Sequence, residues 1–176
     1  MPMYKRARRG MGYLSQEPSI FQRLTVRQNI LAIMETMSLP GRVRRERCDQ
    51  LLEQFGLTRL RSQLARTLSG GERRKLEIAR ALVTNPTMIL LDEPFSGVDP
   101  IAVEELQKEI VGLRDRGISI LLTDHNVRET LSVTDRSYII DNGKVLREGA
   151  PKTLINDELV RRTYLGQTFR GDEFGE

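Results

Sequence analysis

A serine–glycine loop is the first stretch of this sequence whose residue types could act on phosphate. Residues 68–72 read Leu-Ser-Gly-Gly-Glu, and a charged stretch follows them. Ser69 and Glu72 have the spacing of a capping box, in which each side chain satisfies a backbone N–H at a helix start. A cap does not need glycines, which cost backbone entropy in the first turn of a helix. A loop whose N–H groups approach an anion closely does need them. The pattern therefore predicts a helix N-terminus, with Gly70 and Gly71, that faces a phosphate.

Polar residues also follow two wholly apolar stretches. Asp92 and Glu93 come after the first stretch, and Asp124 and His125 come after the second. Ligands of open parallel sheets bind beyond the carboxyl ends of the strands. Mg²⁺ takes carboxylate oxygens together with phosphate oxygens and water, so Asp92 suits a metal. Glu93 is then available to orient a water molecule, or accept its proton, as the water attacks a phosphoryl group. The single histidine is placed to contact the transferred phosphate, although capping and other structural roles are the alternative for all four side chains.

Alternating extended and helical patterns must position these residues. We predict strands at 11–14, 88–91 and 118–123, a hairpin at 137–149 around Asn142-Gly143, and helices at 25–37, 43–55, from Ser69 to before Asn85, at 101–116, and from Pro151 on. The hairpin rests on the Asn-Gly pair, which type I′ turns favour. Strands that are apolar throughout are typical of parallel strands covered on both faces by helices. The fold class is therefore α/β.

Composition is that of an ordinary globular domain. The chain has 176 residues, of which 39% are hydrophobic and 30% charged. Its apolar runs are too short to cross a bilayer, and the N-terminal stretch lacks the apolar segment of a signal peptide, so we expect a cytoplasmic protein. The single cysteine, Cys48, agrees with a reducing compartment and is interpreted as a helix packing residue.

The net charge of +4 includes three basic clusters, at residues 5–9, 42–47 and 73–75. Such clusters bind nucleic acid or anionic lipid headgroups in some proteins. In most proteins they are solvated helix faces, and we favour that interpretation here.

Five stretches resemble, in order, the motifs of the nucleotide-binding subunits of ABC transporters. Gln16 in YLSQE resembles the Q-loop, LSGGE the signature loop, MILLDEP the Walker B strand with Asp92 and Glu93, SGVDP the D-loop with Asp99, and His125 the switch histidine. Any one of these motifs arises by chance, but the ordered set is highly specific.

The resemblance implies an ABC ATPase fold that uses ATP and Mg²⁺. Glu93 and His125 are then the catalytic residues, and Asp92 and Gln16 contact the metal. The nucleotide-binding residues are Gln16, Ser69, Gly70, Gly71, Glu72 and Asp99. The signature residues among them contact the γ-phosphate of an ATP held by a second copy of the subunit in a head-to-tail dimer.

The resemblance also implies a docking groove for a transmembrane permease subunit. The groove lies near the Q-loop, along residues 16–37, and receives a short helix from the permease. Apolar residues in this stretch exceed what one short helix is expected to bury, and they are Ile20, Phe21, Ile30, Leu31 and Ile33. We predict that Phe21 is a docking residue, with a place in the core as the alternative.

A narrower resemblance is to the ATPases of lipopolysaccharide exporters of Gram-negative bacteria, which lie on the inner face of the inner membrane. It rests on RARRGMGYLSQEPSIFQRLTV, LSGGERRKLEIARAL, DEPFSGVDP, LTDHNVRETL and YLGQTF. Ser15 departs from the proline that this group commonly has. A cassette of a branched-chain amino acid transporter or of another ABC transporter is the alternative.

No stretch of the sequence reads G-x-x-x-x-G-K-[ST], the Walker A loop that cradles the nucleotide phosphates. We therefore expect one partial ATPase domain over 1–176, with a helical and signature part at about 20–85, core strands at 86–150 and a helical tail at 151–176. Alone, such a chain is expected to hydrolyse ATP poorly or not at all. A degenerate, inactive cassette is the alternative, against which the intact Glu93 and His125 count.

Nucleic-acid-associated ATPases share the same signature and provide a rival function. They insert long coiled coils between the Q-loop and the signature. Gln16 and Ser69 are only 53 positions apart, and the interval has no sustained heptads. We therefore expect no nucleic acid partner.

Overall fold

The computed structural model describes residues 1–165, in two compact units that divide after Asp124. We describe each unit by itself. The first contains the strands β1 (Met11–Leu14), β2 (Met88–Asp92) and β3 (Ser119–Thr123) and the helices α1 (Met3–Ala7), α2 (Val26–Glu35), α3 (Gly41–Gln54), α4 (Gly70–Ala81) and α5 (Pro100–Asp115). Except for α1, each of these elements is predicted from the sequence to within three residues at either end.

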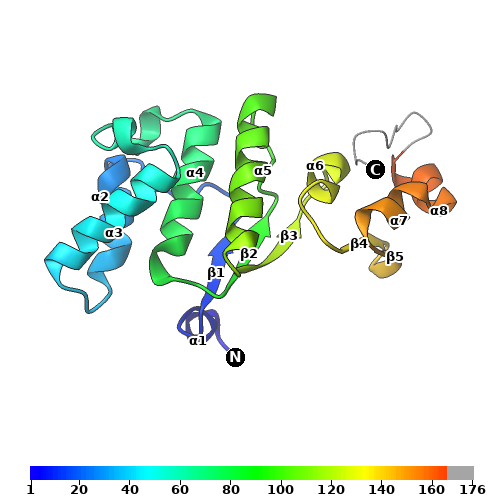
Figure 1. Cartoon of the computed structure of the whole chain (residues 1–176), viewed down its shortest axis with the longest axis horizontal. Coiled ribbons are helices and arrows are strands. Elements are labelled where there is room, and N and C mark those ends of the chain that lie inside the picture. The colour runs from blue at the N-terminus through cyan, green and yellow to red at the C-terminus, as the bar shows by residue number, and fades with distance from the viewer. Residues whose placement is uncertain (166–176) are drawn as a thin grey trace. The chain divides into compact units, whose positions relative to one another are not determined.

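The three strands form a parallel sheet in the order β1–β2–β3 (Figure 1). Leu14 pairs with Leu91, and Asp92 pairs with Thr123 at the carboxyl edge. The predicted α/β class is therefore confirmed. The carboxyl edge is where the segments after β1 and β2 begin, so the Q-loop and the Asp92-Glu93 pair leave the sheet side by side.

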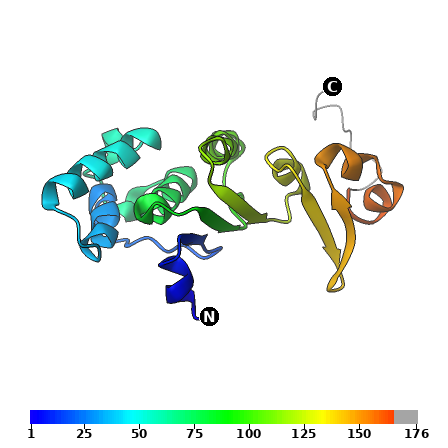
Figure 2. The ribbon, with the colours of Figure 1, turned by 60° about the horizontal axis from the view of Figure 1, so that its bottom comes forward.

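Helices cover only one face of this sheet. In both views α5 lies over the strands, and α4 packs on β1 and against α5 (Figures 1 and 2). On the opposite face, Tyr13 is 51% exposed and Leu121 is 53% exposed. The prediction that helices cover both faces is wrong for residues 1–165, because no helix among them packs on the face that carries Tyr13. Apolar strands alone indicate that both faces are suited to burial, and they do not show what covers each face.

Between the Q-loop and α4, the chain forms a helical layer. Thr25 and Gln28 make the predicted capping box at the start of α2, with both reciprocal hydrogen bonds present. The helices α2 and α3 pack on each other, and two short 3₁₀ turns, Thr58–Leu60 and Ala65–Thr67, complete the layer. Cys48 is buried in α3, which confirms its predicted packing role, and burial raises the pKa of its thiol to about 11.

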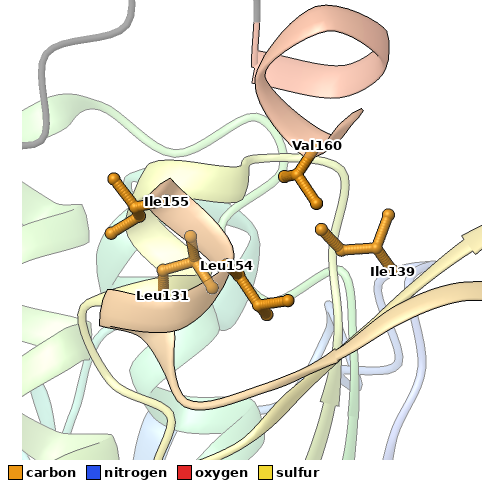
Figure 3. Close-up of a cluster of buried hydrophobic side chains, with 5 residues drawn as sticks. All are labelled: Leu131, Ile139, Leu154, Ile155 and Val160. Atoms are coloured by element: carbon orange, nitrogen blue, oxygen red, sulfur yellow. The ribbon is translucent and has the colours of Figure 1, made fainter. Parts of the chain in front are cut away.

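The second unit is a hairpin with short helices. It contains α6 (Val127–Leu131), β4 (Ser137–Asp141), β5 (Lys144–Gly149), α7 (Pro151–Asn156), α8 (Glu158–Val160) and a π-helical turn, Arg161–Leu165. The predicted hairpin is confirmed, with positive φ at both Asn142 and Gly143 as a type I′ turn requires. Figure 3 shows its core, made by Leu131, Ile139, Leu154, Ile155 and Val160.

The end of the predicted tail, including Gly166–Phe169 of the YLGQTF stretch, lies outside the described residues. Within 1–165, no helix has both the length and the apolar character that spanning a membrane requires.

Candidate nucleotide site

Asp92 ends β2 at the carboxyl edge of the sheet, and both of its carboxylate oxygens accept hydrogen bonds. The Thr123 hydroxyl donates to Oδ1 at 2.8 Å, and the Tyr13 hydroxyl donates to Oδ2 at 3.3 Å. The pKa of Tyr13 is raised, first by loss of solvent around the hydroxyl and then by the charge of Asp92. Sequence reasoning missed Tyr13 and Thr123. The strand alternation could have indicated them, because it places both on the same sheet face as Asp92.

Glu93 has a positive φ of 44°, in the left-handed region that non-glycine residues avoid. Its N–H donates to the Thr123 carbonyl at 2.7 Å, and its carbonyl accepts from Arg74 at 3.2 Å and from the Ser96 N–H at 3.3 Å. A backbone of this kind costs about 1–3 kcal/mol and persists only where its surroundings fix it. These three bonds supply that restraint.

The Q-loop side chain meets the Glu93 carboxylate directly. The Gln16 amide nitrogen donates to Glu93 Oε2 at 2.8 Å. The predicted proximity of Gln16, Asp92 and Glu93 is therefore present in the structure. Gln16 is exposed, as a residue that contacts a ligand must be.

Arg74 of α4 is the central polar residue behind this edge, although sequence reasoning gave it no role. It is 6% exposed, and each N–H of its guanidinium donates a hydrogen bond. The acceptors are the carbonyls of Ser15, Asp92, Glu93 and Pro94 and the carboxylate of Glu77. One buried cation thus holds the start of the Q-loop and the two residues after β2 against the same helix.

The signature loop forms the predicted helix start. Glu72 N donates to Ser69 Oγ at 3.3 Å, and Ser69 N donates to Glu72 Oε2 at 2.8 Å. Gly70 is exposed, and an added Cβ would lie 3.4 Å from the Gly97 carbonyl. Gly71 is buried, and an added Cβ would lie only 2.5 Å from the Ala102 Cβ. The second glycine therefore also permits close packing of α4 on α5.

The remaining predicted site residues have local partners or belong to the other unit. Asp99 caps α5 by accepting from Ala102 N at 3.0 Å, and Asp124 accepts from Phe95 N at 3.1 Å. The carboxylate of Glu72 is engaged in the capping box. His125 begins the second unit, so its predicted place near Glu93 stays a prediction.

The oxygen atoms at the sheet edge fit a magnesium ion. Within residues 1–165, no three His, Cys, Asp or Glu side chains gather to hold a metal by themselves. Asp92 offers a carboxylate, and Gln16 keeps its amide oxygen because its nitrogen is the atom bound to Glu93. One carboxylate and one neutral oxygen, completed by phosphate and water, are the ligands that Mg²⁺ prefers.

Comparisons with known proteins agree with this geometry. Residues 2–96 match the family model described as ABC transporter. The chain is 54% identical over 171 residues to the lipopolysaccharide export system ATP-binding protein LptB of Haemophilus influenzae, covering 97% of this chain and 71% of that protein.

Solved structures show the same fold. An ATP-binding cassette of an ABC transporter in its ADP conformation matches with a TM-score of 0.77 and 29% identity, over 93% of this chain and 71% of that one. A dimeric post-hydrolysis cassette bound to ADP and phosphate matches with a TM-score of 0.73 and 25% identity, over 85% of this chain and 66% of that one. With its ordered motifs and its sheet-edge carboxylates, the chain belongs to the family of ABC transporter ATP-binding cassettes.

Proposed function

We propose that the chain is the ATP-hydrolysing subunit of a transporter that exports lipopolysaccharide, working on the inner face of the inner membrane. The observation that carries the ATPase part is the bond from Gln16 to Glu93, beside Asp92 at the open edge of the sheet. The cargo is supported by the relative from Haemophilus influenzae. We further propose that both compact units belong to one ATPase domain.

Each polar residue at the edge has a distinct role in this proposal. Glu93 accepts the proton of the attacking water, while Gln16 and Asp92 hold Mg²⁺ and His125 contacts the transferred phosphate. When bound, Mg²⁺ neutralises charge on the nucleotide phosphates. Gln16 bonds to Glu93 and also borders the docking segment, so it links the hydrolytic site to the transmembrane partner.

The 176 residues contain no G-x-x-x-x-G-K-[ST] sequence, so we propose that this chain by itself does not turn over ATP. Experiments on activity therefore use an extended chain, which carries the Walker A segment of the Haemophilus influenzae relative in front of Met1. The extended chain should restore lipopolysaccharide export in bacteria depleted of their own export ATPase. If it hydrolyses ATP but does not restore export, the cargo is wrong and the ATPase assignment stands.

The signature loop of one subunit is proposed to close the nucleotide site of a second copy, so a bulky cation at its tip should prevent closure. In an extended chain that also carries Glu93→Gln, Ser69→Arg should abolish the ATP-dependent dimer, as measured by size-exclusion chromatography. Ser69 is exposed, so the arginine does not disturb a core. Gly71→Asp is unsuitable, because Gly71 is buried against Ala102.

Two controls separate closure from local folding. Ser62→Arg adds the same side chain at an exposed serine outside the motif and should leave the dimer intact. Ser69→Ala removes the cap, at a cost of about 1 kcal/mol, without adding bulk, and should retain most of the dimer. A stable dimer with Ser69→Arg would show that the signature loop lies outside the interface.

Phe21 is the apolar residue of the docking segment that the structure leaves open. Its exposed fraction is 43%, whereas Ile20 and Ile30 are buried and Leu31 and Ile33 are partly buried. This exposure contradicts the core alternative for Phe21. An exposed aromatic ring is a suitable anchor for a short helix laid in a groove.

Phe21→Ala should therefore release the subunit from the detergent-solubilised transporter, with a loss on the order of 2 kcal/mol of affinity. Its melting temperature should stay nearly unchanged. Tyr4→Ala is the matched control, because Tyr4 is also exposed and also lies beneath an arginine, Arg8, at 5.8 Å. Undiminished co-purification of Phe21→Ala with the transmembrane subunits would place docking elsewhere.

A further inference from the structure

One face of α4 binds the whole segment that leads from β1 to the docking residue. Arg74 donates to the Ser15 carbonyl at 2.9 Å. One turn later, Glu77 Oε1 accepts from the Ser19 N–H at 2.8 Å, and two turns later Arg80 donates to the Ser19 carbonyl at 2.6 Å. Residues three apart lie on one face of a helix, so these three side chains form a continuous row. We call Arg74, Glu77 and Arg80 the polar row.

Arg80 also contacts Phe21 itself. The guanidinium carbon lies 4.5 Å from the centre of the Phe21 ring, within the range of a cation–π contact. Burial lowers the pKa of Arg80, and its Nε is buried without a hydrogen-bond partner among residues 1–165. A side chain that gives up this much solvation to lie on a ring restricts where the ring can go.

The backbone of Phe21 is fixed from a second direction. Asn29 of α2, which is fully buried, accepts from the Phe21 N–H at 2.8 Å and donates to the Phe21 carbonyl at 3.1 Å. The ring nevertheless remains 43% exposed. An exposed aromatic residue held at both its backbone and its ring face has little freedom left to lose when a partner binds.

We propose that Arg80 is a positioning residue that holds the Phe21 ring ready for the transmembrane partner, and that the polar row makes this anchor move together with the signature helix. The proposal rests on the proposed docking function. Because α4 begins at the signature loop, closure of that loop on nucleotide would displace the docking ring in the same step. The row provides a physical path of contacts for this coupling.

The sequence contains no tryptophan, so Phe21→Trp places a single fluorescent probe at the anchor. In this background, Arg80→Gln keeps a donor for the Ser19 carbonyl but removes the cation from the ring. We expect on the order of a fivefold larger population of detached ring, corresponding to a contact of about 1 kcal/mol. The readouts are lower fluorescence anisotropy and faster acrylamide quenching.

Three further variants make the measurement decisive. Arg80→Ala should give the same change or a larger one, and Arg80→Lys should recover part of the restraint. Arg44→Ala, an arginine of α3 outside the row, should leave the probe unchanged. Equal anisotropy and quenching in Arg80→Gln, Arg80→Ala and the parent would overturn the proposal, provided that their melting temperatures show folded protein.

A double-mutant cycle separates this proposal from the docking proposal. If Arg80 acts through Phe21, Arg80→Gln should weaken co-purification with the transmembrane subunits in the parent and add no further loss in Phe21→Ala. Additive losses would overturn the positioning role. If Phe21→Ala has no effect on docking while the probe still responds to Arg80, the docking function fails and the restraint on the ring stands.

Discussion

Glu93→Gln in the extended chain should reduce ATP turnover by about 10³-fold, the middle of the range that a general base contributes. The amide keeps the size and polarity of the carboxylate but cannot accept a proton from water. Its oxygen can still accept the bond that Gln16 donates to Glu93 at 2.8 Å, so the site should keep its shape. Nucleotide binding should therefore persist while hydrolysis is lost.

Steady-state phosphate release measures the turnover, and equilibrium binding of a fluorescent ATP analogue measures the affinity. Glu17→Gln is the matched control, because it makes the same change at an exposed glutamate beside the Q-loop glutamine. Equal turnover in Glu93→Gln and the parent would remove Glu93 from the catalytic role. Loss of binding together with turnover would instead indicate a structural role.

The largest effect on stability is expected from the buried ion pair behind the site. Glu77→Ala leaves the Arg74 guanidinium, 6% exposed, without its counter-charge, and it also leaves the Ser19 N–H without its acceptor. Breaking a buried pair by removing one partner costs about 3–5 kcal/mol of unfolding free energy. A loss of this size exceeds a fifth of the stability of most single domains.

Denaturant titration of the parent and the variant measures this difference. Glu105→Ala provides the comparison, because Glu105 pairs with Lys75 at a partly exposed site. An exposed pair contributes about 0–1 kcal/mol, so its loss should be much smaller. If the two variants lose equal stability, burial of the Arg74–Glu77 pair is not what gives it importance.

The features predicted from the sequence are those that short stretches determine. The capping boxes at Thr25 and Ser69 and the turn at Asn142-Gly143 depend on residues within three positions of one another, and all three are present. The order of motifs predicts the gathering of Gln16 with the two acids, because parallel strands bring their carboxyl ends to one edge.

The features that were missed depend on contacts between distant parts of the chain. Arg74 reads as one more charge in a basic stretch, and only the fold shows that Ser15 and Glu93 lie against it. The packing role of Gly71 requires knowledge that Ala102 approaches it from α5. The uncovered sheet face could not be inferred from strand composition, because apolar residues indicate suitability for burial and not the presence of a cover.

The left-handed backbone of Glu93 also bears on how this sequence is maintained in evolution. At such a position glycine is the relaxed choice, so a glutamate is kept there at the expense of folding free energy. Selection for a stable fold alone would favour its replacement. A population that no longer needed the chemistry would therefore drift away from glutamate at this site sooner than from the buried residues around it, and the persistence of the acid records continued use of the reaction.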